Sequence, residues 1–314
     1  MRGIRFFPAD LNIAFMSKRM VFFAFSAALI VSSLVLLVAR DLNYGIDFQG
    51  GILIEVRTEK AADIGALRGQ LSDLDLGEVA LQGFGQPTDV LVRIQRQEGG
   101  EDAQQAAVDK VKKALGDKVT YRRTEFVGPK VSQELLLDGV LAVVLAIIAI
   151  LIYIWFRFEW QFGLAAVIAL THDVAATLGV FALMQLEFNL TTVAAVLTIA
   201  GYSINDTVVV FDRVRENLRK YKKMPLEELF NNSINQTLSR TTMTSFTTLL
   251  ALLALYFLGG AVIRDFSFAM IWGIVVGTYS SICVAVPLLL YMNLDRAGMA
   301  SEKEGEEAAA DTAP

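Results

Sequence analysis

Six long apolar blocks constrain the fold of this chain more strongly than any other feature of its sequence. A helix needs roughly 20 apolar residues to cross a bilayer, and each block is close to that length. Hydrophobic residues make up 54% of the 314 positions and charged residues only 19%, which is too apolar for an ordinary soluble domain. The sequence therefore predicts a polytopic α-helical membrane protein with six transmembrane helices. The expected spans are Met20–Ala39, Leu136–Trp155, Phe162–Met184, Leu190–Phe211, Thr242–Leu258 and Phe266–Met292.

The first block follows Lys18 and Arg19, as the apolar core of a signal peptide would. Its apolar run is longer than such a core, however, and no pair of small residues typical of a cleavage site comes after it. We therefore expect residues 20–39 to be retained as the first transmembrane helix, behind a cytoplasmic segment 1–19.

Basic residues predict the orientation of the spans, because Lys and Arg concentrate in cytoplasmic loops. The loop after the third block, 185–189, contains none. Basic residues precede the first block, at Arg2, Arg5, Lys18 and Arg19. The loop after the fourth block, expected within 212–241, carries a basic cluster at Arg213, Arg215, Arg219, Lys220, Lys222 and Lys223. This alternation predicts that both termini are cytoplasmic and that residues 136–292 contain the second to sixth spans.

Residues 40–135 lie between the first two spans and are polar enough for an external domain. Alternating residues predict strands, and apolar residues at helical spacing predict helices. The expected elements are strand 51–57, helix 62–74, strand 78–84, strand 89–96, helix 102–115 and strand 119–128. The turn "GQPT" separates the middle strands. This βαββαβ order predicts a ferredoxin-like α+β domain. The preceding "YGIDFQGG" is either a hinge, since glycine permits unusual backbone angles, or a plain turn.

Several classes of protein are disfavoured by composition. The net charge is −5, and most of it lies in the acidic tail 293–314, which we expect to be disordered. No basic field recruits nucleic acid, so nucleic acid is not an expected partner. One cysteine and one histidine exclude an internal disulfide and make a zinc site improbable. We expect no metal site.

An acid inside the fourth apolar block and a base next to the fifth form the first candidate site. Asp206 on the fourth span and Arg240 at the start of the fifth are expected at similar depth, in the inner half of the membrane. A charge near the centre of a transmembrane helix costs roughly 2.5–3.5 kcal/mol on insertion scales, so such residues face a bundle interior or a hydrated cavity. Arg240 would favour the charged carboxylate and burial the neutral acid. The pair is therefore predicted to form a proton-relay site, with a static salt bridge as the alternative.

Further polar residues accompany this pair. Asp173 lies near the middle of the third span beside His172. It is a third candidate for the proton relay, although a role in helix packing is equally open, and His172 needs no special role. The expected polar lining of the path is Thr198, Tyr202, Asn205, Ser239 and Thr244. On the sixth span, Gly273 and Gly277 form a small-residue face for close helix packing.

The chain resembles the SecF proteins of the SecD/SecF family of protein-export membrane proteins, within the resistance-nodulation-division superfamily. The resemblance covers almost the whole chain in order. It rests on "YGIDFQGG" at 44–51, "TEFVGPKVSQEL" at 124–135, "THDVAATLG" at 171–179, "GYSINDTVVVFDRVREN" at 201–217, "SINQTLSRTTMTS" at 233–245 and "RDFSFAMIWGIVVGTYSS" at 264–281.

The resemblance implies a subunit in the bacterial inner membrane that works without a cofactor, driven by the proton gradient. It implies pairing with SecD, which supplies a matching six-span half, and action with the SecYEG channel on preproteins in the periplasm. Accessory translocon subunits are further possible partners. The family's proton-site carboxylate and arginine fall on Asp206 and Arg240, and 40–135 becomes a periplasmic domain that moves with the proton cycle.

Three other functions fit parts of the sequence. A half-size proton-driven exporter of small molecules or lipids would share the superfamily plan. An intramembrane aspartyl protease would use Asp173 and Asp206 as paired acids, but Arg240 would oppose the proton that such a pair shares, and no G-x-G-D surrounds either acid. A purely structural scaffold would need neither acid. We therefore expect no enzymatic activity and assign no catalytic residue.

Overall fold

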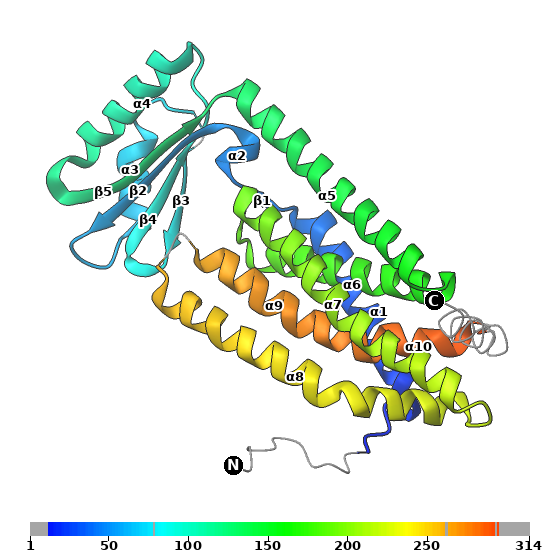
Figure 1. Ribbon diagram of the computed structural model, residues 1–314. Coiled ribbons are helices and arrows are strands. Elements are labelled where there is room, and N and C mark those ends of the chain that lie inside the picture. Colours follow the sequence, from blue (N-terminus) through cyan, green and yellow to red (C-terminus); the bar gives the residue numbers. More distant parts are fainter. Residues whose placement is uncertain (1–11, 78, 261–262, 293, 295–314) are drawn as a thin grey trace, which may run out of the picture.

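The computed structural model describes residues 12–77, 79–260, 263–292 and 294. Within them, six helices are long and apolar enough to cross a membrane. They form an elongated bundle, and an α+β unit inserted after the first helix sits at one end of it (Figure 1). The helices are α1 (Arg19–Arg40), α5 (Pro129–Arg157), α6 (Trp160–Met184), α7 (Leu190–Lys220), α8 (Leu226–Leu258) and α9 (Arg264–Ser280). The prediction of six spans is confirmed at the level of length and composition. The predicted segment 1–19 is described only from residue 12, and most of the tail 293–314 lies outside the described residues.

The expected basic loop 212–241 is mostly helical. Helix α7 continues to Lys220 and α8 begins at Leu226, so that only five residues separate them. The reason is that the polar segment is amphipathic. Its buried apolar residues recur at helical spacing: Val214, Leu218, Phe230 and Ile234.

The α+β unit follows the order strand, helix, strand, strand, helix, strand. Its four strands form one antiparallel sheet in the order β3-β4-β2-β5. The elements are β2 (Gly51–Thr58), α3 (Ile64–Ser72), β3 (Val79–Phe84), β4 (Gln86–Ile94), α4 (Gly100–Leu115) and β5 (Val119–Val127). Both helices cover one face of the sheet over a core of buried aliphatic side chains, including Ile52, Ile54, Val108 and Val111.

The turn between β3 and β4 is shorter than the four residues "GQPT" that the sequence suggested. Phe84 already pairs with Gln86, so Gly85 alone makes the turn. Gly85 has a φ of 71°, in the region that a glycine adopts without strain.

The segment that enters the sheet is more ordered than either a hinge or a plain turn suggested. Strand β1 (Asn43–Tyr44) pairs in parallel with β6 (Glu187–Phe188), which lies in the loop between α6 and α7. A short helix, α2 (Ile46–Gln49), follows and packs against the second face of the sheet through Ile46. At Gly51, φ is 119°, and an added Cβ would lie 2.6 Å from the carbonyl oxygen of Ile94. This close approach explains a glycine at the start of β2.

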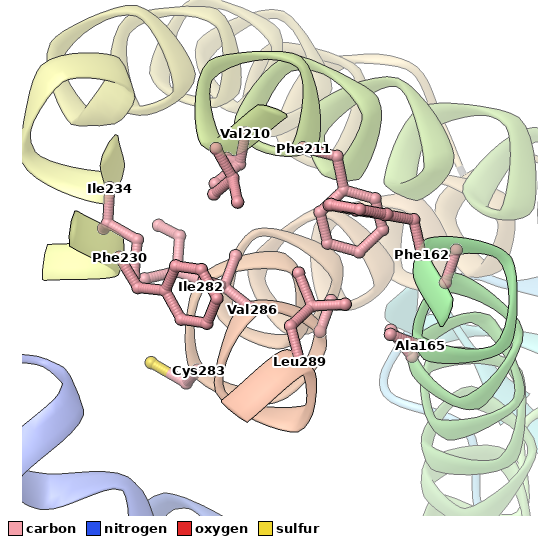
Figure 2. Close-up of a cluster of buried hydrophobic side chains, with 14 of the residues drawn as sticks. Phe162, Ala165, Val210, Phe211, Phe230, Ile234, Ile282, Cys283, Val286 and Leu289 are labelled. Carbon is pink, nitrogen blue, oxygen red and sulfur yellow. The ribbon is translucent and has the colours of Figure 1, made fainter. Parts of the chain in front are cut away.

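The bundle has two buried cores. The one beside the α7–α8 connection gathers aromatic residues from several helices (Figure 2). Phe162 of α6 and Phe211 of α7 meet there edge to face, with ring centroids 5.2 Å apart. The second core, nearer the α+β unit, centres on Phe181, Ile199 and Ile274. Phe162 and Phe211 thus hold α6 against α7 at one end while aliphatic packing holds α9 against them at the other.

The sixth span was expected to be a single helix over Phe266–Met292, but it is not one continuous α-helix. After α9 ends at Ser280, the chain forms a π-helical turn, η3 (Ser281–Ala285), and then α10 (Val286–Leu288) and a 3₁₀ turn, Leu289–Tyr291. Pro287 offers a physical reason, because it has no N–H to donate to the carbonyl four residues before it.

Helix α9 approaches α7 closely through the two glycines singled out in the sequence. A Cβ at Gly273 would overlap the side chain of Ile199, and one at Gly277 would lie 3.1 Å from Cβ of Ser203. A larger residue at either position would therefore push the helices apart.

We predict that Gly273→Ala destabilises the purified chain by about 1–3 kcal/mol, the range expected for overpacking. Gly201→Ala is the matched control on α7, since a Cβ there meets nothing within 4 Å. Thermal unfolding in detergent should show a lower midpoint for the first variant only. Equal midpoints would mean that α9 can shift away from Ile199 at no cost.

Candidate functional site

Asp206 is held inside the bundle by hydroxyl groups. Its side chain on α7 is 2% exposed. Its Oδ2 accepts hydrogen bonds from Ser245 Oγ of α8 at 3.5 Å and from Thr278 Oγ1 of α9 at 3.4 Å. The two hydroxyls also lie 2.7 Å from each other. The carboxyl group therefore joins three helices through long, weak hydrogen bonds to uncharged partners.

Arg240 was expected to contact this carboxyl group, and it does not. Its side chain is exposed on α8 and forms no ion pair with Asp206 among the described residues. It is close enough for an electrostatic interaction with the acid. Ser245, five residues further along α8, takes the position facing Asp206. The predicted static salt bridge is thus absent from this structure.

Asp173 is fully buried on α6 and has its own set of partners. Its Oδ2 accepts hydrogen bonds from Ser203 Oγ of α7 at 2.5 Å and from Ser280 Oγ of α9 at 2.8 Å. Its Oδ1 lies 3.0 Å from Nδ1 of His172. The acid therefore ties the same helices, α7 and α9, that meet at Asp206.

The predicted polar lining lies mainly on the outside of the chain. Four of these residues are exposed: Thr198, Asn205, Ser239 and Thr244. Tyr202 is half-buried and donates to Thr248 at 3.5 Å. The hydroxyls of Thr198 and Thr244 donate to backbone carbonyls one turn earlier. These residues form an exposed polar face on α7 and α8, beside Asp206 but not in contact with it.

The residues that do hold the two acids were only partly identified from the sequence. The acids were singled out from the sequence, but none of the four hydroxyls that hold them, on Ser203, Ser245, Thr278 and Ser280, is among the predicted lining residues. The spacing gave a usable signal for Ser203, since it lies three residues before Asp206 and so on a similar face of α7. Within the part of the chain that the structure describes, no group of His, Cys, Asp or Glu is arranged to hold a metal ion.

A charged cavity of about 630 Å³ lies where the α+β unit meets the C-terminal end of α8 and the N-terminal end of α9. Arg57 donates to both oxygens of the buried Asp89, at 2.5 and 2.6 Å. Arg122 lies 3.6 Å from Glu55 and from Asp89. The hydrogen bonds from Arg57 lower the pKa of Asp89 despite the opposing effect of burial. The lining holds four arginines and two acids, and both acids are paired with arginines in an ion-pair network.

Asp89→Asn should destabilise the full chain at pH 7 by about 1–3 kcal/mol, because it leaves the partner guanidinium poorly satisfied. A lowered pKa in the folded state means that the contribution is present above the unfolded pKa and is lost as the pH falls through the folded one. The difference between wild type and variant in thermal unfolding should therefore shrink below about pH 4. Glu59→Gln, at an exposed acid after β2, is the control. A difference that stays constant down to pH 3 would contradict the ion-pair explanation.

The described chain is a polytopic membrane protein in which an α+β unit separates the first two of six apolar helices and two acids are buried among the helices. Comparison with known families agrees with this architecture. The family model "Protein export membrane protein SecD/SecF, C-terminal" matches residues 107–295, and "SecD/SecF GG Motif" matches residues 35–62. The chain belongs to the SecD/SecF family.

Curated relatives match nearly end to end. The protein translocase subunit SecF of Cereibacter sphaeroides is 49% identical over 304 residues, covering 93% of both chains. That of Rickettsia felis is 46% identical over 290 residues, covering 91% of this chain and 94% of the relative.

Two solved structures share the fold. The crystal structure of SecDF from Thermus thermophilus, described as a translocon-associated membrane protein, is 40% identical with a TM-score of 0.84 and covers 91% of this chain. A second SecDF structure, in the super-membrane-facing form, is 36% identical with a TM-score of 0.65. The chain spans only 39% and 42% of these longer SecDF chains.

Proposed function

We propose that this chain is a subunit of the Sec protein-export machinery and uses the proton-motive force to promote a late stage of preprotein export. The export function is inferred from its relatives, which are named protein translocase subunit SecF. The observation that supports proton use is Asp206, a buried acid in a membrane bundle whose only hydrogen-bond partners in the described chain are hydroxyls. A carboxyl group held in this way can gain or lose a proton without breaking a salt bridge.

The exposed polar face supports a partner half in the membrane. Arg240 and the exposed residues around it lie on helices long enough to cross the bilayer, where contact with lipid would cost several kcal/mol for the charge alone. Another protein chain must therefore cover this face. SecD is the proposed partner, since the SecDF relatives are longer chains of which this one matches part.

The topology follows from the same proposal. We place the chain in the bacterial inner membrane with both termini in the cytoplasm, and residues 40–135 as a periplasmic domain. The order of strands and helices in that domain supports a ferredoxin-like assignment. The proposed client is a preprotein emerging from the SecYEG channel.

The proton cycle is proposed to act on the external domain through contacts at the outer ends of the helices. A change of charge at Asp206 alters its bonds to α8 and α9. At the outer end of α9, Arg264 donates to the carbonyl oxygen of Gly85 at 3.0 Å. In the loop before α7, Glu187 forms an ion pair of 2.7 Å with Arg93 of β4. One charge crossing 100 mV releases about 2.3 kcal/mol, enough to bias an equilibrium between two positions of the domain.

The other functions fit the structure less well. A protease that uses paired acids needs Asp173 and Asp206 to share a proton, but each binds its own hydroxyls and neither contacts the other in the described structure. A half-size exporter of small molecules or lipids remains the alternative. It predicts that loss of the chain impairs efflux and leaves preprotein export normal.

Asp206→Asn should reduce export of a periplasmic reporter in energised cells to the rate seen in wild-type cells whose proton-motive force has been collapsed. Asp212→Asn is the control, because it lies on the same helix in an exposed ion pair with Arg157 and should export normally. Equal membrane abundance is checked by immunoblot. If Asp206→Asn exports at the energised wild-type rate and still responds to the gradient, the acid has a structural role only.

Cysteine cross-linking tests the partner face. The only cysteine, Cys283, is buried and can be replaced by serine. In that background, Thr198→Cys and Thr244→Cys should each cross-link to a membrane-embedded partner of the size of SecD. Val31→Cys, exposed on α1, is the control and should not. Absence of cross-links from both polar positions in intact membranes would rule out this face as the interface.

A further inference from the structure

Asp173 and His172 form a second buried acid–base pair that the proposed function does not require. The carboxylate is 0% exposed and the imidazole 5%. Apart from His172, the hydrogen-bond partners of Asp173 are the hydroxyls of Ser203 and Ser280. No Lys or Arg forms an ion pair with it among the described residues. His172 is therefore the only basic group in contact with this acid.

A buried carboxylate without a cation is expensive, and a shared proton removes that cost. The proton has two positions in this pair. It lies either on Asp173, which then donates to Nδ1 of His172, or on the imidazole, which then donates to the carboxylate. When the proton leaves, the neutral imidazole can still donate through Nδ1. The two side chains can therefore share one proton, and the state of the imidazole reports where that proton lies.

The surroundings of the imidazole allow a second protonation state. Its Nε2 is buried and has no hydrogen-bond partner in the described chain. The ring faces Tyr279 of α9, with ring centroids 6.2 Å apart. The Tyr279 hydroxyl bonds to Ser26 and donates to the carbonyl oxygen of Phe22, both on α1. Tyr279 on α9 is the titratable group that contacts the pair from a neighbouring helix, and Cys283 of η3 interacts with Tyr279 in turn.

Two helices connect this pair to Asp206. On α9, Thr278 donates to Asp206 and Ser280, two residues later, donates to Asp173. On α7, Ser203 donates to Asp173 from a position three residues before Asp206. Because Gly277 has no Cβ, α9 can lie close to both Ser203 and Asp173. A change in charge at one acid therefore pulls on the helices that hold the other.

The structure of the sixth span is suited to respond to such a pull. The π-helical turn η3 begins directly after Ser280, at Ser281. Ser281 bonds to Thr207, the neighbour of Asp206, at 2.8 Å. A π turn holds one residue more than an α turn, and such turns occur frequently at functional sites. The segment 278–285 therefore combines hydrogen-bond donors to both acids with a π-helical turn.

We propose that Asp173 and His172 form a second proton-exchanging site, coupled to Asp206 by the hydrogen bonds of Ser203, Thr278 and Ser280. This site extends the proposed function, because it gives the transport cycle a second place to hold a proton. Ser203, Thr278 and Ser280 are positioning residues in this scheme.

The single histidine makes the proposal directly measurable. The full chain, carrying an affinity tag without histidine and reconstituted with its partner in lipid nanodiscs, is labelled with ¹⁵N-histidine. The imidazole resonances distinguish the two neutral tautomers from the imidazolium ion. Between pH 5 and pH 9 the wild type should show one transition between two states of the ring. A ring that stays in one neutral tautomer throughout this range overturns the proposal.

Three variants test the partners. Asp173→Asn should leave the imidazole neutral over the whole range. Ser280→Ala keeps both ionisable groups and removes one donor to the carboxylate, which disfavours the charged carboxylate, so its transition should move to higher pH. Asp206→Asn should move the transition, whereas an unchanged midpoint would disprove the coupling. The spectra do not depend on export, so failure of the proposed export role leaves this test intact.

Discussion

The need to satisfy two carboxyl groups inside a membrane-length bundle organises the centre of this structure. Among the residues that the structure describes, no Lys or Arg contacts Asp206 or Asp173, and hydroxyls from neighbouring helices fill that role. Most of these hydroxyls come from α7 and α9, which must then run close together. Gly273 and Gly277 permit that approach. The polar network therefore depends on the glycine packing, because the hydroxyls reach the acids only where α7 and α9 lie close together.

The membrane-length helices and the α+β unit could be predicted because both depend on patterns within short segments. Apolar length marked the six helices, and alternation marked the strands of the sheet. The extent of α7 was underestimated, since charged residues hid an amphipathic pattern around Val214, whereas the amphipathic pattern of 225–238 did indicate the helix that leads into the fifth span. The β1–β6 pair could not be predicted, because each strand has two residues and the paired residues lie 144 positions apart in the sequence.

The two acids of the candidate site could be predicted from the sequence, but the side chains that donate hydrogen bonds to them could not. A carboxylate in an apolar block is visible in the sequence because of its cost. Its hydrogen-bond donors depend on the rotation of each helix about its axis, which sequence spacing only restricts. Arg240 shows the difference, since it was placed at the depth of Asp206 but faces outward, where Ser245 faces in. Only the packed arrangement shows which side of α8 meets α7.

The pairing of β1 with β6 has a consequence for how this family can vary. The link between the start of the α+β unit and the α6–α7 loop combines main-chain pairing with side-chain contacts, because Arg93 of β4 binds both Asn43 of β1 and Glu187 of β6. An insertion or deletion would disturb both, because one extra residue on either strand reverses which side chains point outward. Homologous chains should therefore keep the loop lengths on both sides of positions 43–44 and 187–188 constant, and should keep residues at 43, 93 and 187 that can bind one another.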